Sequence, residues 1–143
     1  MPPSNPWQSY RQVATQTASP GQLVLMLFDG AIRFLEKARL GFAADDPLEF
    51  NQTINNNVVR AQDILHELNW SLDLEKGGKF AATLRRLYGY MDHRLHDSNQ
   101  YKREDGIVDV IQRVTVLRDA WAEMLRNGAS NGTPDEVQLS AVG

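Results

Sequence analysis

The sequence predicts an all-α protein: an antiparallel four-helix bundle with a short N-terminal helical segment and a disordered C-terminal tail. Four stretches repeat apolar residues at steps of three and four, breaks rich in glycine, proline and asparagine separate them, and no stretch has the alternation of a strand. Such helices can hide their apolar stripes only against one another. With 143 residues, 42% of them hydrophobic, the chain has room for one domain with its own core.

The first long helix is expected to begin at Ser19 and to end near 45–47. A serine cap, a proline at the first helical position and a glutamine three residues after the cap are typical of a helix start. No further proline occurs before Pro47, which disfavours helix at the residue before it. The core stripe of this helix comprises Leu23, Val24, Leu27, Phe28, Ala31, Phe34, Leu35 and Ala38.

Each of the other three helices carries one straight apolar seam. The seams comprise Ile54, Val58, Ala61, Leu65, Leu68 and Leu72 on the second helix, Phe80, Leu84, Leu87, Met91 and Leu95 on the third, and Ile107, Ile111, Val114, Leu117, Trp121 and Leu125 on the fourth. We expect the second helix to end before a reversal at Gly77–Gly78, the third to end around 99–106, and the fourth to stop at Asn127–Gly128.

The two ends of the chain differ from the bundle, which is expected to span 19–126. In residues 1–18, Trp7 and Tyr10 are spaced by three, as on one face of a helix too short to be stable unless it docks on the bundle. Residues 127–143 are small, polar and aperiodic, which indicates a disordered tail.

The composition argues against several classes of function. There are no cysteines, so disulfides, thiolate nucleophiles and cysteine zinc sites are excluded. The net charge of -3, without any basic block, argues against nucleic acid as a partner. The longest apolar run, Leu23 to Phe28, is far shorter than the ~20 residues of a membrane span, and the first twenty residues do not resemble a secretory signal. We therefore expect a cytoplasmic protein without membrane insertion.

No constellation of residues predicts catalysis, a cofactor or a metal site. The nearest approach to a carboxylate–metal motif is Asp63 with His66, which a helical wheel places off the apolar seam. His93 and His96 share a helix face but bring no further ligand. Acidic residues such as Asp29 fit a solvated helix face. The sequence therefore favours a binding protein over an enzyme.

The helices carry more apolar residues than one core needs. Leu25 and Ile32 lie off the stripe of the first helix, Val59 and Trp70 off the seam of the second, and Tyr90 off the seam of the third. We interpret these five as candidate contacts for a partner helix, which binds a groove at steps of three, four and seven. Alternatively, the N-terminal segment covers them, or they are isolated surface residues.

Three blocks of sequence extend over most of the chain. They are Tyr10 followed by ASPGQLVLMLFDGAIRFLEKA from Ala18 to Ala38, LNWSLDLEKGGKFAATLRRLYGYMDHRL from Leu68 to Leu95, and LRDAWAEM from Leu117 to Met124. In this order and with these gaps, they resemble the flagellar secretion chaperone family, FliS.

The resemblance implies a helical bundle that binds the C-terminal segment of flagellin in the cytoplasm, prevents premature polymerisation and hands flagellin to the cytoplasmic domain of the flagellar export gate. It also implies an N-terminal lid over or beside the binding surface, which adds Trp7 and Tyr10 to the candidate contacts. Whether other flagellar regulators compete for this surface stays open. So does a rival interpretation, a structural or signalling bundle that self-assembles through the same apolar strips.

Overall fold

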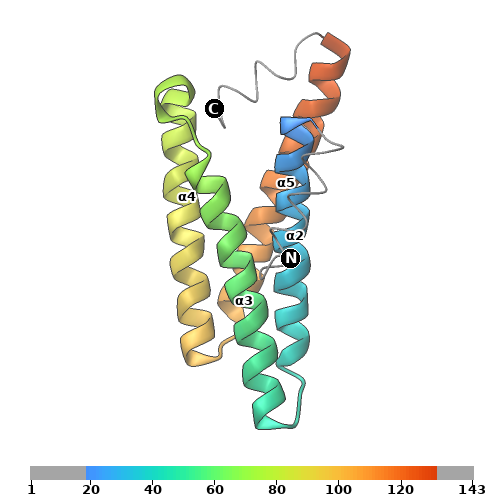
Figure 1. The fold of residues 1–143 in the computed structure, drawn as a ribbon, viewed down its shortest axis with the longest axis vertical. Helices are drawn as coiled ribbons and strands as arrows, with labels where there is room; N and C mark the ends of the chain where they lie inside the picture. The colour runs from blue at the N-terminus through green and yellow to red at the C-terminus, as the bar shows by residue number, and fades with distance from the viewer. Residues whose placement is uncertain (1–18, 132–143) are drawn as a thin grey trace, which may run out of the picture.

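The computed structural model describes residues 19–131, and this part of the chain consists of four α-helices (Figure 1). They are α2 (Pro20–Gly41), α3 (Pro47–Trp70), α4 (Leu74–Tyr101) and α5 (Asp105–Asn131). Each helix runs antiparallel to the next, and α2 packs against α3 and α5 while α4 packs against the same two helices. The predicted all-α class and antiparallel bundle are confirmed. No helix in the described part is long and apolar enough to span a membrane.

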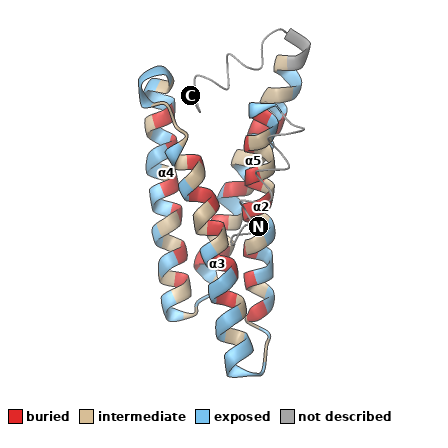
Figure 2. Ribbon diagram, in the orientation of Figure 1, coloured by how far each residue is buried: buried red, intermediate tan, exposed pale blue. Residues whose placement is uncertain are grey.

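The core lies along the bundle axis, where the predicted seams meet (Figure 2). Burying a leucine or isoleucine side chain stabilises a fold by ~1.5–3 kcal/mol, so the seams hold the four helices together. The largest fully buried side chains are Leu35, Ile54, Ile64, Leu65, Met91, Leu95, Ile107, Val58, Val110 and Val114.

The start of α2 confirms the predicted cap, whereas its end falls earlier than expected. The Ser19 hydroxyl accepts a hydrogen bond from the Gln22 backbone N–H at 3.2 Å, and the Gln22 side chain accepts one from the Ser19 N–H at 3.1 Å. The helix ends at Gly41, where α3 approaches so closely that a Cβ would lie 2.9 Å from the Thr53 methyl carbon. Asp46 then caps α3 by accepting a hydrogen bond from the backbone three residues later.

The second helix ends before Gly77–Gly78, as expected, because α3 ends at Trp70. Helical residues resume earlier than expected, at Leu74: the Asp73 carboxylate accepts hydrogen bonds from the N–H groups two and three residues later, at 3.1 and 2.9 Å, and so caps a first turn of α4 ahead of the glycines. The expected break is present at Gly78, where φ 53° and ψ -131° kink α4 and separate this first turn from the rest of the helix. A side chain disfavours this backbone conformation, which glycine adopts readily.

Two further expectations from the sequence are corrected. Phe80, expected in the third seam, is 54% exposed, because it lies two residues after the break at Gly78, which changes the direction of α4 there. α5 continues to Asn131, past the expected stop at Asn127–Gly128. One glycine costs a helix about 1 kcal/mol but does not terminate it.

The two pairs of helices, α2 with α5 and α3 with α4, spread apart toward one end of the bundle (Figure 1). This end, called the open end below, holds the start of α2, the end of α3, the start of α4 and the second half of α5. The opposite end holds the α2–α3 and α4–α5 connections.

Candidate functional site

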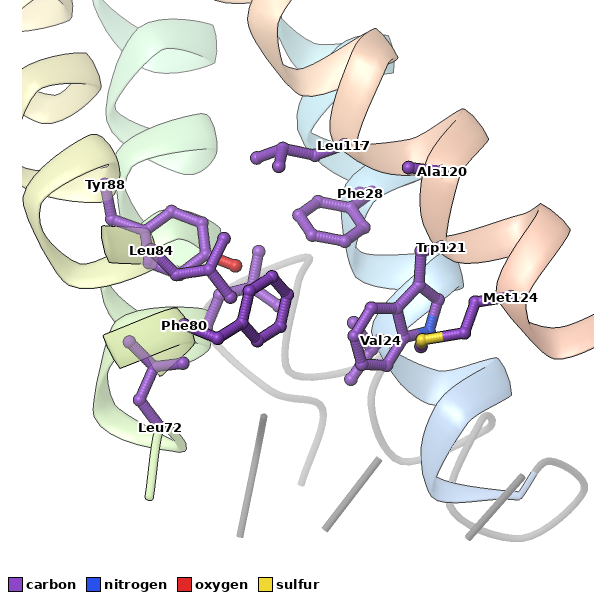
Figure 3. A pocket seen from close by; sticks show the side chains of 11 residues that line it. Val24, Phe28, Leu72, Phe80, Leu84, Tyr88, Leu117, Ala120, Trp121 and Met124 are labelled. Carbon is purple, nitrogen blue, oxygen red and sulfur yellow. The ribbon is translucent and has the colours of Figure 1, made fainter. Parts of the chain in front are cut away.

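An apolar pocket lies at the open end, and side chains from both helix pairs line it (Figure 3). Its volume is about 130 Å³, close to the ~150 Å³ of an apolar cavity that holds one benzene molecule. The pocket therefore has room for one large apolar side chain. It is lined by Val24, Phe28, Leu68, Leu72, Phe80, Leu84, Tyr88, Leu117, Ala120, Trp121 and Met124.

Trp121 forms a fixed wall of the pocket. Its indole N–H donates a hydrogen bond to the Gly21 carbonyl of α2 at 2.9 Å. Its ring packs edge-to-face on Phe28, with ring centroids 6.5 Å apart and planes 70° apart, a favourable geometry for aromatic pairs. Because both contacts are made to α2, Trp121 joins α2 and α5 at the wall of the pocket.

The mouth of the pocket is formed by exposed residues from opposite helix pairs. Phe80 of α4 lies across the pocket from Trp121 (Figure 3), and Ala120 of α5 is exposed beside it. The small Ala120 side chain leaves space that a larger residue would fill. Because these two lining residues are exposed, the pocket is open to solvent between them.

Tyr88 brings a hydroxyl group to this otherwise apolar lining. The residue is buried, and its hydroxyl oxygen points into the pocket (Figure 3). Burial raises the pKa of the Tyr88 hydroxyl above its ordinary value, because the phenolate would lose its hydration. At physiological pH the group is therefore a neutral hydroxyl, which can donate a hydrogen bond through its hydrogen and accept one through its oxygen.

The off-stripe residues of α2, Leu25 and Ile32, are half-buried and pack against the core. Asp29 lies between these two residues on the same off-stripe face of α2, and its carboxylate accepts a hydrogen bond from the Arg118 side chain of α5 at 2.8 Å. α5 thus packs beside the face of α2 that was predicted to be open to a partner. Asp29, expected on a solvated face, instead joins two helices.

Val59 and Trp70 of α3 are exposed, at 41% and 83%. Val59 lies three residues before Gln62, whose side chain donates a hydrogen bond to Asp92 of α4 at 3.1 Å. Residues three apart share a helix face, so Val59 lies on the α4 side of α3.

Tyr90 lies on a different face, between α4 and α5. Its hydroxyl donates a hydrogen bond to Asp109 at 2.8 Å, and the Arg113 guanidinium stacks 4.7 Å from its ring centre. The structure therefore distributes the five off-stripe residues over three faces and does not bring them together. Trp7 and Tyr10 lie outside the described residues, and partner binding at all seven positions stays a prediction.

The pocket could not be predicted from the sequence, because helical periodicity places most of its lining residues in the core. Of the remaining three, Tyr88 is the most informative: it follows Leu84 by four residues and precedes Met91 by three, so spacing alone could have placed it on the third seam. A buried tyrosine hydroxyl usually needs a partner. A tyrosine on a core seam is thus the signal that could have indicated a site there.

Within residues 19–131, no three histidine or acidic side chains group as metal ligands would. His66, considered with Asp63 from the sequence, is exposed and lies 2.9 Å from an Asp92 carboxylate oxygen. His93 is also exposed and lies 3.4 Å from Asp97. These contacts account for both histidines as surface pairs.

The described part of the chain is thus an all-α helical bundle with an apolar pocket that has room for one side chain. Comparison with known families shows to which family such a bundle belongs here. The family model described as Flagellar protein FliS matches residues 3–128, most of the chain. The chain belongs to the FliS family of flagellar secretion chaperones.

Three characterised relatives are similar over nearly their whole length. The flagellar secretion chaperone FliS of Bacillus subtilis (strain 168) is 32% identical over 123 residues, which cover 86% of this chain and 88% of the relative. The protein of the same name from Salmonella typhimurium is 34% identical over 121 residues, 82% and 87% of the two chains. That from Campylobacter jejuni is 33% identical over 121 residues, 85% and 91%.

Proposed function

We propose that this chain is a flagellin export chaperone. It binds the C-terminal segment of flagellin in the cytoplasm, keeps that segment from polymerising early and delivers flagellin to the cytoplasmic domain of the flagellar export gate. The observation that carries the proposal is the apolar pocket at the open end, which is preformed and reachable from solvent. Membership of a secretion chaperone family supports the same conclusion.

The mechanism is coupled folding and binding. An amphipathic segment that is unfolded when free becomes helical when an apolar surface covers its apolar face. The segment loses its conformational entropy on binding, and the contacts with the surface compensate for this loss. The pocket accepts one anchor side chain, and the anchor fixes the register of the segment on the bundle. While bound, the same apolar face is withheld from other flagellin molecules, so premature assembly stops.

One anchor alone gives only weak binding. Burying one leucine or phenylalanine gains ~1.5–3 kcal/mol, which corresponds to roughly a 10- to 150-fold change in affinity. Further contacts along the segment are therefore needed. The exposed Val59 and Trp70 of α3 are the strongest candidates among the seven predicted residues. The other members of the proposed set are Trp7, Tyr10, Leu25, Ile32 and Tyr90. Because the described members lie on three faces, a segment that contacts them has to pass over more than one face of the bundle. Several weak contacts also suit a client that must be released at the export gate.

Titration calorimetry with purified flagellin tests this proposal. We expect a one-to-one complex that requires the C-terminal segment of flagellin. Its affinity should change little between low and high salt, because salt weakens charge pairs much more than apolar burial. The proposal fails if flagellin without its C-terminal segment binds equally well, or if the affinity falls steeply with salt.

A further inference from the structure

The Tyr88 hydroxyl points into the pocket (Figure 3) and has no hydrogen-bond partner within the described residues. The indole N–H of Trp121, the other polar side-chain group of the lining, already donates to the Gly21 carbonyl. Among the described residues that line the pocket, the Tyr88 hydroxyl is therefore an uncommitted polar group on an apolar wall. This arrangement is typical of ligand sites, where a few polar groups in an apolar lining fix orientation and specificity.

The state of Tyr88 limits what the group can bind. Its raised pKa keeps the hydroxyl neutral, and none of the described residues that line the pocket is a lysine, an arginine or a histidine. A carboxylate brought into this apolar space would lose its hydration without gaining a counter-ion, which is costly. Lysine and arginine side chains carry no acceptor atom, so neither can receive a hydrogen bond from the Tyr88 hydroxyl. The hydroxyl hydrogen is the atom that closure of the pocket would leave unpaired, and the complementary ligand atom is therefore an uncharged hydrogen-bond acceptor.

We propose that Tyr88 is a specificity determinant of the pocket and donates a hydrogen bond to an uncharged acceptor carried beside the apolar anchor of the flagellin segment. This inference rests on the proposed function. A segment that filled the pocket with hydrocarbon alone would close the hydroxyl off from water and leave it unpaired, and a buried unpaired polar group is destabilising. Tyr88 thereby discriminates between apolar segments that fit the pocket equally well.

Two parts of the client can supply the acceptor. The last four carbonyl groups of a helix have no partner within that helix, so a main-chain carbonyl beside the anchor is one source. The other source is the side-chain oxygen of a serine, threonine, asparagine or glutamine. Both are neutral acceptors, and they can be distinguished by experiment.

The test is flagellin binding by the full-length Tyr88→Phe variant, which loses the hydroxyl and keeps the ring. We expect affinity about 2- to 10-fold weaker, the usual range for one neutral hydrogen bond, and a Tm equal to or above that of the parent. Tyr101→Phe is the matched control on the same helix, because Tyr101 is exposed and does not line the pocket. It should change neither quantity.

Alanine replacement of each polar side chain in the flagellin segment distinguishes the two sources. If one replacement weakens binding to the parent but not to Tyr88→Phe, that side chain supplies the acceptor. If every replacement affects both proteins equally while Tyr88→Phe still binds more weakly, the acceptor is a main-chain carbonyl. Either result supports the proposal.

Unchanged flagellin affinity of Tyr88→Phe overturns the inference, and so does a clear fall in Tm, which would show that the hydroxyl is bonded within the chain. Ala120→Phe, which fills the mouth of the pocket, distinguishes this failure from failure of the proposed function. If Ala120→Phe binds weakly and Tyr88→Phe binds normally, only the role of Tyr88 is wrong. If both bind normally, the pocket is not the flagellin site.

Discussion

At the scale of single residues, two glycines of α4 have opposite effects on the helix. Gly78 adopts φ 53° and ψ -131°, a conformation that an L-residue adopts only with strain. Gly89 is helical and exposed, and a Cβ added there would meet nothing within 4 Å. The first glycine is required by the backbone, whereas the second only adds flexibility to the unfolded chain and weakens the helix.

Gly89→Ala should therefore raise the free energy of unfolding by up to ~1 kcal/mol, since alanine favours helix over glycine by about that amount. Gly78→Ala, the matched change eleven residues earlier, should lower it because the positive φ is strained for alanine. Urea unfolding monitored by circular dichroism measures both. Destabilisation by Gly89→Ala would show that the site lacks the free space described above.

At the scale of helices, a carboxylate joins α4 to α5. Asp109 of α5 accepts hydrogen bonds from the Tyr90 hydroxyl at 2.8 Å, from Arg94 at 3.2 Å and from Arg113 at 3.0 Å. Burial alone would raise the pKa of Asp109, but the bonds from Tyr90, Arg94 and Arg113 outweigh it and hold the pKa below its ordinary value. Tyr90, an expected partner contact, therefore also has a structural role.

The lowered pKa of Asp109 predicts a pH-dependent contribution to stability. Because the folded-state pKa lies below the ordinary value of 3.8, the contribution is present above pH ~4 and is lost as the pH falls through the folded-state pKa. Asp109→Asn should be less stable than the parent at pH 7, by roughly 1–2 kcal/mol, and the difference should shrink in acid.

Unfolding by urea between pH 7 and pH 3 measures this difference. Asp105→Asn is the control, because Asp105 is mostly exposed and lies 3.7 Å from the Arg94 side chain, so its pair should contribute little. An Asp109→Asn deficit that stays constant down to pH 3 would contradict the assigned role of the carboxylate.

At the scale of the whole molecule, the bundle could be predicted from the sequence and its pocket could not. Helical period alone reveals which face of each helix is apolar, and residues such as Ile54, Met91 and Ile107 are fully buried as expected. Period does not reveal how far apart two helices lie. Leu84 and Trp121 sit on correct seams, yet they line a pocket because the helix pairs diverge at the open end.

The off-stripe residues illustrate the same limit from the other direction. The sequence predicts Ile32 on an open strip, but Ile32 is half-buried against the core. It predicts Phe80 in the core, but Phe80 lies exposed after the Gly78 break. The exposure of each residue depends on the position of a neighbouring helix or on one backbone torsion angle. Neither can be deduced from the residue type and its spacing in the sequence.

The measurement that tests the central claim most directly is photo-crosslinking from the mouth of the pocket. Phe80 is replaced by benzoylphenylalanine, which keeps an aromatic side chain at an exposed position, and the complex with full-length flagellin is irradiated and mapped by mass spectrometry. A second protein carries the same group at Leu48, 63% exposed at the opposite end of the bundle.

If the pocket holds the client, the probe at position 80 forms a covalent adduct within the C-terminal segment of flagellin, and the probe at position 48 forms little or none. Flagellin without that segment should give no adduct from position 80. An adduct from position 48 with none from position 80, or a crosslink from position 80 that maps outside the C-terminal segment, would contradict the account.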